Sequence, residues 1–118
     1  MNSASALSRS LVSYSTTMAE FLKVAEVAEV PPGTVKHVVL LGKHIALCNV
    51  DGEFYAIDNF CVHRGAPLSQ GWLDGCFLEC PLHGWKFDVR TGAVTADPRM
   101  GNPTYEVRVE GTDILIAA

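Results

Sequence analysis

The sequence predicts an all-β fold, a small antiparallel sandwich or barrel with hardly any helix. In residues 31–58, PPGTVKHVVLLGKHIALCNVDGEFYAID, β-branched and aromatic residues alternate with other types around glycines, which is typical of strands. Asp51 and Gly52 lie between two apolar runs, where such a pair favours a hairpin turn. No apolar period of 3.6 residues continues beyond about ten residues, so long amphipathic helices are not expected.

The remaining elements follow the same pattern. Residues 21–27, FLKVAEV, are compatible with either a strand or a helix. Further strands are predicted within residues 75–80, 86–96 and 104–117, because each stretch carries apolar residues between turn signals. Turns are expected at Thr91-Gly92 and within residues 110–113.

A chain of 118 residues is large enough for one domain with a real core, and we expect that domain to span residues 18–118. Residues 1–17 differ from the rest, with six serines, one arginine and no acidic residue. This composition favours a disordered tail or an upstream start before Met18, and an organelle-targeting segment is the alternative. A secretory signal is excluded, because these residues contain no apolar core of about 7 residues or more.

The composition narrows the possible partners. With 48% hydrophobic and 19% charged residues, and no apolar run near the roughly 20 residues of a membrane helix, the chain is expected to be soluble and cytoplasmic. The formal charge of -4 and the absence of a basic cluster argue against a nucleic-acid partner. A basic protein partner remains possible. We also expect a monomer whose protein partners bind transiently.

Two cysteine-histidine pairs suggest one metal site. Cys61 and His63 stand two positions apart, and Cys80 and His83 stand three apart, both in loops rich in glycine and proline. Sixteen residues separate His63 from Cys80, which is room for one short hairpin. A hairpin with a ligand loop at each end can place two thiolates and two imidazoles around a common point.

Two kinds of metal site use this ligand set. Two thiolates and two imidazoles suit a tetrahedral zinc ion, and they equally suit a 2Fe-2S cluster in which histidines replace two cysteines. Zinc modules usually pair cysteine with cysteine, whereas each loop here contributes one of each, which favours a site with two iron atoms. Gly65 and Gly84 follow the histidines closely, where the absence of a side chain would let backbone N-H groups approach bridging sulfides.

At these residues the chain resembles the Rieske family, in a likeness that spans about residues 18 to 118. The resemblance implies a 2Fe-2S cluster with Cys61 and Cys80 on the inner iron. It further implies that His63 and His83 hold the outer iron near the surface. It also implies a β-sandwich base that carries a small cluster-binding subdomain formed by the two loops.

The resemblance also indicates a branch of the family. Respiratory members carry an extra cysteine in each loop, joined as a disulfide, and this chain has Ala66 and Leu82 at those positions. The match is therefore to soluble ferredoxins and to the N-terminal domains of ring-hydroxylating oxygenases. A terminal oxygenase also needs a mononuclear iron site, and no catalytic domain follows here.

The remaining cysteines and histidines have simpler interpretations. Cys48 and Cys76 lie in strand-like runs and are expected to be buried packing residues rather than ligands. His37 and His44 flank an apolar stretch and are expected to face solvent.

Two further features follow His83 in the sequence. Trp85 and Phe87 are expected to shield the cluster, to fill the core, or both. Residues 98–103 are either a third loop that covers the cluster or an ordinary strand connection.

The function that follows is one-electron transfer by a protein that is not itself an enzyme. The chain has no dinucleotide-binding glycine motif, so nicotinamide and flavin chemistry must lie on another protein. The leading hypothesis is a carrier that takes electrons from a flavin-dependent NAD(P)H reductase and gives them to a terminal non-haem iron oxygenase. The alternatives are the small subunit of an NADH-dependent nitrite reductase and a structural zinc-binding interaction module.

Overall fold

The computed structural model describes residues 20–61, 65–82 and 84–118, and the regular structure in these ranges is almost wholly β-strand. The predicted tail, residues 1–17, lies outside them. The helical elements within these ranges are two short 3-10 turns, η1 (Val27–Glu29) and η2 (Leu68–Gln70). The strands are β1 (Phe21–Glu26), β2 (Val35–Leu40), β3 (Lys43–Val50), β4 (Glu53–Asp58), β5 (Trp72–Asp74), β6 (Phe77–Glu79), β7 (Lys86–Asp88), β8 (Thr104–Glu110) and β9 (Asp113–Ala117).

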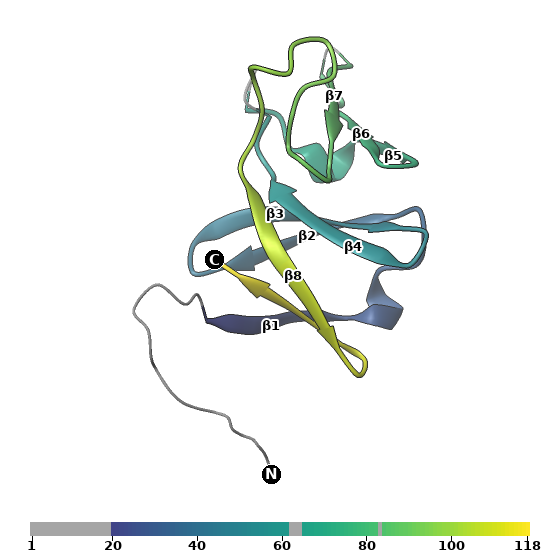
Figure 1. Cartoon of the computed structure of the whole chain (residues 1–118), viewed down its shortest axis with the longest axis vertical. Coiled ribbons are helices and arrows are strands. Elements are labelled where there is room, and N and C mark those ends of the chain that lie inside the picture. Colours follow the sequence, from purple (N-terminus) through teal and green to yellow (C-terminus); the bar gives the residue numbers. More distant parts are fainter. Residues whose placement is uncertain (1–19, 62–64, 83) are drawn as a thin grey trace.

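The strands form two antiparallel sheets. The larger sheet has the order β1-β9-β8-β4-β3-β2 and the smaller has the order β5-β6-β7. Figure 1 shows the small sheet at one end of the molecule, beyond the large sheet. The all-β prediction is confirmed, and the ambiguous stretch at residues 21–27 forms strand β1 and the start of η1.

Tight hairpin turns connect β2 to β3, β3 to β4 and β8 to β9 in the large sheet. Asp51 and Gly52 join β3 to β4 with φ angles of 51° and 94°, the left-handed pair that a type I′ turn requires. The predicted turn is confirmed. Leu41 and Gly42 make the same kind of turn between β2 and β3, with φ angles of 53° and 80°. Sequence patterns gave no signal for it, because a leucine rarely adopts a positive φ.

The first hydrophobic core lies inside the curled large sheet. Alternate residues of β3, Ile45 and Leu47, are fully buried and point into it. The other buried members come from β1, β2, β4, β9 and the turn after η1: Ala25, Val30, Val38, Leu40, Ala56, Ile114 and Ile116.

The second core lies between the large sheet and the small subdomain. Ala46 and Cys48 of β3 point to this side, so β3 is buried on both faces, which explains its nearly continuous apolar sequence. The other buried members are Ile57, Cys61, Ala66, Leu68, Leu78, Cys80, Phe87, Val89 and Val94. Both candidate cysteine ligands therefore belong to the core that joins the two parts of the molecule.

Candidate metal centre

Cys61 and Cys80 lie against each other at this junction. Cys61 follows β4 and is 2% exposed, and Cys80 directly follows β6 and is fully buried. Burial raises the pKa of the Cys80 thiol, the Leu82 backbone N-H lowers it, and a hydrogen bond with the Cys61 thiol raises it again. Two soft sulfur donors that face each other away from water can bind one thiophilic metal ion.

The first loop closes on itself immediately after Cys61. The Cys61 N-H donates to the Ala66 carbonyl at 2.8 Å, and the Gly65 N-H donates back to the Cys61 carbonyl at 2.6 Å. Gly65 has a φ of 72°, a left-handed conformation that glycine adopts without strain. Two backbone hydrogen bonds therefore hold the ends of this loop together, from Cys61 to Gly65 and Ala66.

The second loop is built in the same way. The Cys80 N-H donates to the Trp85 carbonyl at 2.7 Å, so each cysteine is bonded to a carbonyl five residues later, from 61 to 66 and from 80 to 85. Gly84 has a φ of 71°, close to that of Gly65. Each loop thus has the same kind of closing hydrogen bond and a left-handed glycine, although the two sequences differ.

The two predicted histidines, His63 and His83, lie outside the described residues. Of these four candidates, the structure therefore brings together Cys61 and Cys80. In the described part of the chain, no group of three or more histidine, cysteine, aspartate or glutamate side chains is placed to hold a metal ion.

Asn102 anchors a third loop to the backbone that precedes Cys61. Its side-chain amide donates to the Asp58 carbonyl at 3.0 Å and to the Phe60 carbonyl at 2.8 Å. The side chain is 7% exposed, so these bonds satisfy polar groups that water reaches poorly. The loop that contains residues 98–103 is thus fastened to the residues just before Cys61, and its role as a cover for the cluster stays a prediction.

Asn59, which lies between β4 and Cys61, also fastens the backbone near the first loop. Its side-chain oxygen accepts a hydrogen bond from the Ser69 N-H at 2.9 Å, and its carbonyl accepts one from the Leu68 N-H at 2.6 Å. The residue is 1% exposed. Sequence reasoning missed both asparagines, because an asparagine in a loop is ordinarily solvated and only tertiary contacts reveal its partners.

All four cysteines are free thiols, but the two outside the loops differ from each other. Cys48 is fully buried in β3, where burial raises the pKa of its thiol to about 12. The prediction of a buried packing residue is confirmed there. For Cys76 it is wrong in part, because this residue lies in the β5–β6 turn and is half-buried, although it packs against the second core. Gly75 and Cys76 are needed for the turn, so the strands are shorter than the apolar run suggests.

The other predicted features are divided between core and surface. Phe87 is fully buried, and Trp85 is half-buried against the same core, so both help to fill it. His37 is exposed on β2 as expected. His44 on β3 is only half-exposed, and its ring meets His37, a contact that the sequence did not indicate.

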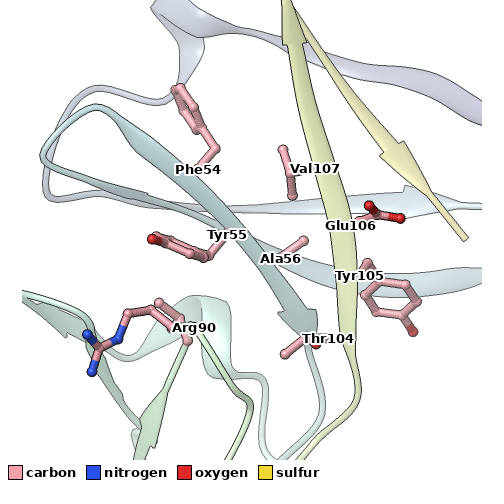
Figure 2. Close-up of a pocket in the computed structure, with 9 residues that line it drawn as sticks. Phe54, Tyr55, Ala56, Arg90, Thr104, Tyr105, Glu106 and Val107 are labelled. Atoms are coloured by element: carbon pink, nitrogen blue, oxygen red, sulfur yellow. The ribbon is translucent and has the colours of Figure 1, made fainter.

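A shallow groove of about 300 Å³ is present, and no cysteine lines it. It forms where β4 and β8 diverge after pairing at Ala56–Tyr105 and Ile57–Thr104. Figure 2 shows the side chains that line it, among them Tyr55 and Arg90. None of its lining residues is a predicted ligand, so the groove is separate from the candidate centre.

Membrane-spanning helices are absent from the described ranges, because no helix there reaches the necessary length and hydrophobicity.

Comparison with known proteins gives one consistent family. The Rieske [2Fe-2S] domain matches residues 20–115. The ferredoxin component of a naphthalene 1,2-dioxygenase system from Pseudomonas aeruginosa is 46% identical over 75% of this chain and 86% of its own length.

Two solved structures extend the comparison. The first is a complex of oxygenase and ferredoxin in carbazole 1,9a-dioxygenase, with 36% identity, a TM-score of 0.76, and coverage of 82% of this chain and 92% of the matched chain. The second is a nitrite reductase small subunit from Mycobacterium tuberculosis, with 26% identity, a TM-score of 0.79, and coverage of 86% and 96%. On the extent of the family match and the identity to the naphthalene dioxygenase relative, the chain belongs to the Rieske [2Fe-2S] domain family.

Proposed function

We propose that this protein is a one-electron carrier that holds one 2Fe-2S cluster. Cys61 and Cys80 bind one iron, and His63 and His83 bind the other. When bound, the cluster supplies a single reversible one-electron step. The protein is thus an electron-transfer component, and the catalysis belongs to a partner.

The described residues fit such a cluster, and the pairing of the two thiols is the observation that carries the proposal. Cys61 and Cys80 come from two loops with the same closing hydrogen bond, and their thiols face each other out of water. Each loop carries its histidine between the cysteine and the carbonyl that closes it. The left-handed glycines leave the backbone near the histidines free of side chains, so N-H groups can approach cluster sulfurs.

The proposed partners are a flavin-dependent NAD(P)H reductase as electron donor and a terminal non-haem iron oxygenase as acceptor. The names of the relatives support this, since one is a ferredoxin component and another was solved with its oxygenase. A rim of apolar side chains supports docking at the cysteine end: Phe60 is 44% exposed, Leu82 is 44% exposed and Met100 is 37% exposed. Phe60 and Leu82 lie within two residues of a cysteine, and Met100 lies in the loop that Asn102 anchors to Phe60.

We further propose that the working domain spans residues 18–118 and acts as a cytoplasmic monomer. Deletion of residues 1–17 is expected to leave cluster content and melting temperature unchanged, because that serine-rich stretch has little apolar surface to bury. A clear fall in melting temperature would contradict this boundary.

The experiment that tests the ligand set is metal and sulfide analysis of the full chain. We expect about two irons and two acid-labile sulfides per chain, and loss of both in His63→Ala and His83→Ala, because a missing ligand leaves an iron open. His37→Ala is the matched control and should retain the cluster. Colourless protein with one bound zinc would establish the zinc alternative instead.

Electron transfer to different partner proteins distinguishes a dioxygenase carrier from a nitrite reductase subunit. Reduced protein mixed with a terminal oxygenase from a naphthalene-type system should be reoxidised in the presence of its aromatic substrate. Transfer to a nitrite reductase large subunit, with none to the oxygenase, would favour the alternative.

A further inference from the structure

His37 and His44 form a pair of imidazoles outside the cysteine loops. His37 Nε2 and His44 Nδ1 are 2.9 Å apart, and the ring planes are inclined by only 22°. The two residues lie on neighbouring antiparallel strands, in diagonal positions on the same face, because Ala46 is the partner of His37 and Val39 is the partner of His44. The strand register therefore brings the rings together.

The two rings differ in how firmly they are held. β3 is paired on both sides, and the His44 carbonyl accepts the Asn59 N-H at 2.9 Å, so the His44 backbone is fixed. The His44 ring also packs against Phe60, with centroids 5.2 Å apart. His37 lies on β2, the edge strand of the large sheet, and is exposed. A ligand from solvent can therefore reach one anchored and one open imidazole.

No carboxylate competes for these rings within the described ranges. The ion pairs there involve lysine and arginine, and the hydrogen bond between the two rings is the only one that either ring makes. Neutral imidazole is a good ligand for zinc, nickel and copper ions. We propose that His37 and His44 form a second metal site, which binds a divalent transition-metal ion through the two facing nitrogens.

Binding requires two local adjustments. His37 must carry its proton on Nδ1 and His44 on Nε2, so that both facing nitrogens offer a lone pair. The rings face each other nearly head-on, so each must turn by a few tens of degrees about its Cβ–Cγ bond, a torsion with a broad minimum. Water completes the coordination, since no third protein ligand of the described chain is close.

An ion at this position would join β2 to β3 beside Phe60, the residue that precedes Cys61. Because the unfolded chain does not hold the two imidazoles together, the ion should raise the melting temperature. This inference concerns residues outside the cluster loops, and only its test uses the proposed cluster, to keep the cysteine loops occupied.

The test is isothermal titration of the full, cluster-loaded, oxidised protein with NiCl₂. Nickel is the probe because it does not oxidise thiols as copper does, and the loaded cluster keeps the cysteine loops occupied. We expect one site per chain and a rise in melting temperature with added Ni²⁺. His37→Gln and His44→Gln should each raise the Kd about tenfold or more, since loss of a direct ligand costs at least as much as loss of an outer-shell partner.

Two matched controls locate the site. Lys36→Gln changes the neighbour of His37 in the chain, which points to the opposite face, and should bind Ni²⁺ as the parent does. Cys76→Ser removes the half-buried thiol and should also leave the Kd unchanged. Equal Kd values for the parent and His37→Gln, or no saturable binding by the parent, would overturn the proposal. The two rings would then form only a hydrogen bond with each other. Loss of binding in Cys76→Ser would assign the ion to that thiol and would also overturn it.

Discussion

Asn102 donates a hydrogen bond to the Phe60 carbonyl at 2.8 Å, which fastens the third loop to the residue that precedes Cys61. A second bond from the same amide reaches the Asp58 carbonyl at 3.0 Å. One buried side chain thus holds the backbone on which the first cysteine ligand depends.

Replacement of Asn102 by alanine should lower the free energy of unfolding by about 1 to 3 kcal/mol, because two poorly hydrated carbonyls lose their donor. Asn102→Asp, which keeps the shape but presents a carboxylate to the same carbonyls, should cost at least as much. Urea denaturation measures both. Arg99→Ala is the control in the same loop, and should cost much less than Asn102→Ala because Arg99 is solvent-exposed in its ion pair with Asp97. Equal effects of Asn102→Ala and Arg99→Ala would show that the amide does not hold the loop.

Gly71 is predicted to be intolerant of any side chain. A Cβ there would overlap the Glu79 carbonyl, and would lie 3.2 Å from the Leu68 carbonyl. Since Glu79 precedes Cys80, Gly71→Ala should displace that cysteine and reduce cluster content as well as stability. Iron analysis measures the cluster content, and thermal melting measures the stability. Gly75→Asn, at a φ of 60° with open space around it, is the control and should retain the cluster. Full cluster content in Gly71→Ala would contradict this account.

The fold class and the cysteine pairing could be predicted from local patterns. Alternation of apolar residues and the Asp51-Gly52 signal depend on the residues themselves, and strands β3 and β4 formed where they indicate. The spacing between Cys61 and Cys80 left room for one hairpin, and β5 and β6 form it.

What could not be predicted depends on contacts between distant residues. Asn102 meets Phe60 across 42 positions of sequence, and the signal for that contact does not lie in either neighbourhood. The contact between the His37 and His44 rings requires the Leu41-Gly42 turn, which sequence patterns did not mark, and the exact register of β2 on β3. A shift of one residue would have placed the two rings on opposite faces.

Cys48→Ser should keep the visible spectrum and lower the free energy of unfolding by about 1 to 3 kcal/mol, because a hydroxyl replaces a fully buried thiol. Cys76→Ser should also keep the spectrum and cost less, since Cys76 is half-buried. Absorption spectra and urea denaturation provide the two readouts. Loss of colour in either variant would make that cysteine a ligand.

Cys48 also predicts a pH dependence. Burial raises the pKa of its thiol from 9.0 to about 12, so between these values the unfolded chain releases a proton that the folded chain keeps. The contribution is therefore fully present below pH 9 and declines above it, by about 1.4 kcal/mol per pH unit. Cys48→Ser, which has no ionisable thiol, should show a shallower loss of stability from pH 9 to 10.5. Parallel slopes for the two proteins would show that the thiol ionises equally in both states.

The last prediction concerns the midpoint potential and rests on Trp85. Rieske centres span about -150 to +300 mV, and the upper end requires extra hydrogen bonds to the cluster and its ligands. High-potential members of the family place a serine two residues after the second histidine, and this chain has Trp85 there, with a backbone N-H but no hydroxyl. The chain also lacks the loop disulfide of those members, since all four cysteines are free. We therefore expect a midpoint below about 0 mV, in the lower third of the range.

The same reasoning determines the pH response, because fewer donors leave the oxidised histidine ligands protonated at their outer nitrogens above neutral pH. Reduction near pH 7 should then take up no proton. Protein-film voltammetry from pH 6 to 9 tests both points, and Trp85→Ser should raise the midpoint. A midpoint above about +150 mV, or a slope near 59 mV per pH unit already at pH 7, would group the protein with the high-potential members. Either result would contradict a ferredoxin that is reduced by a flavoprotein.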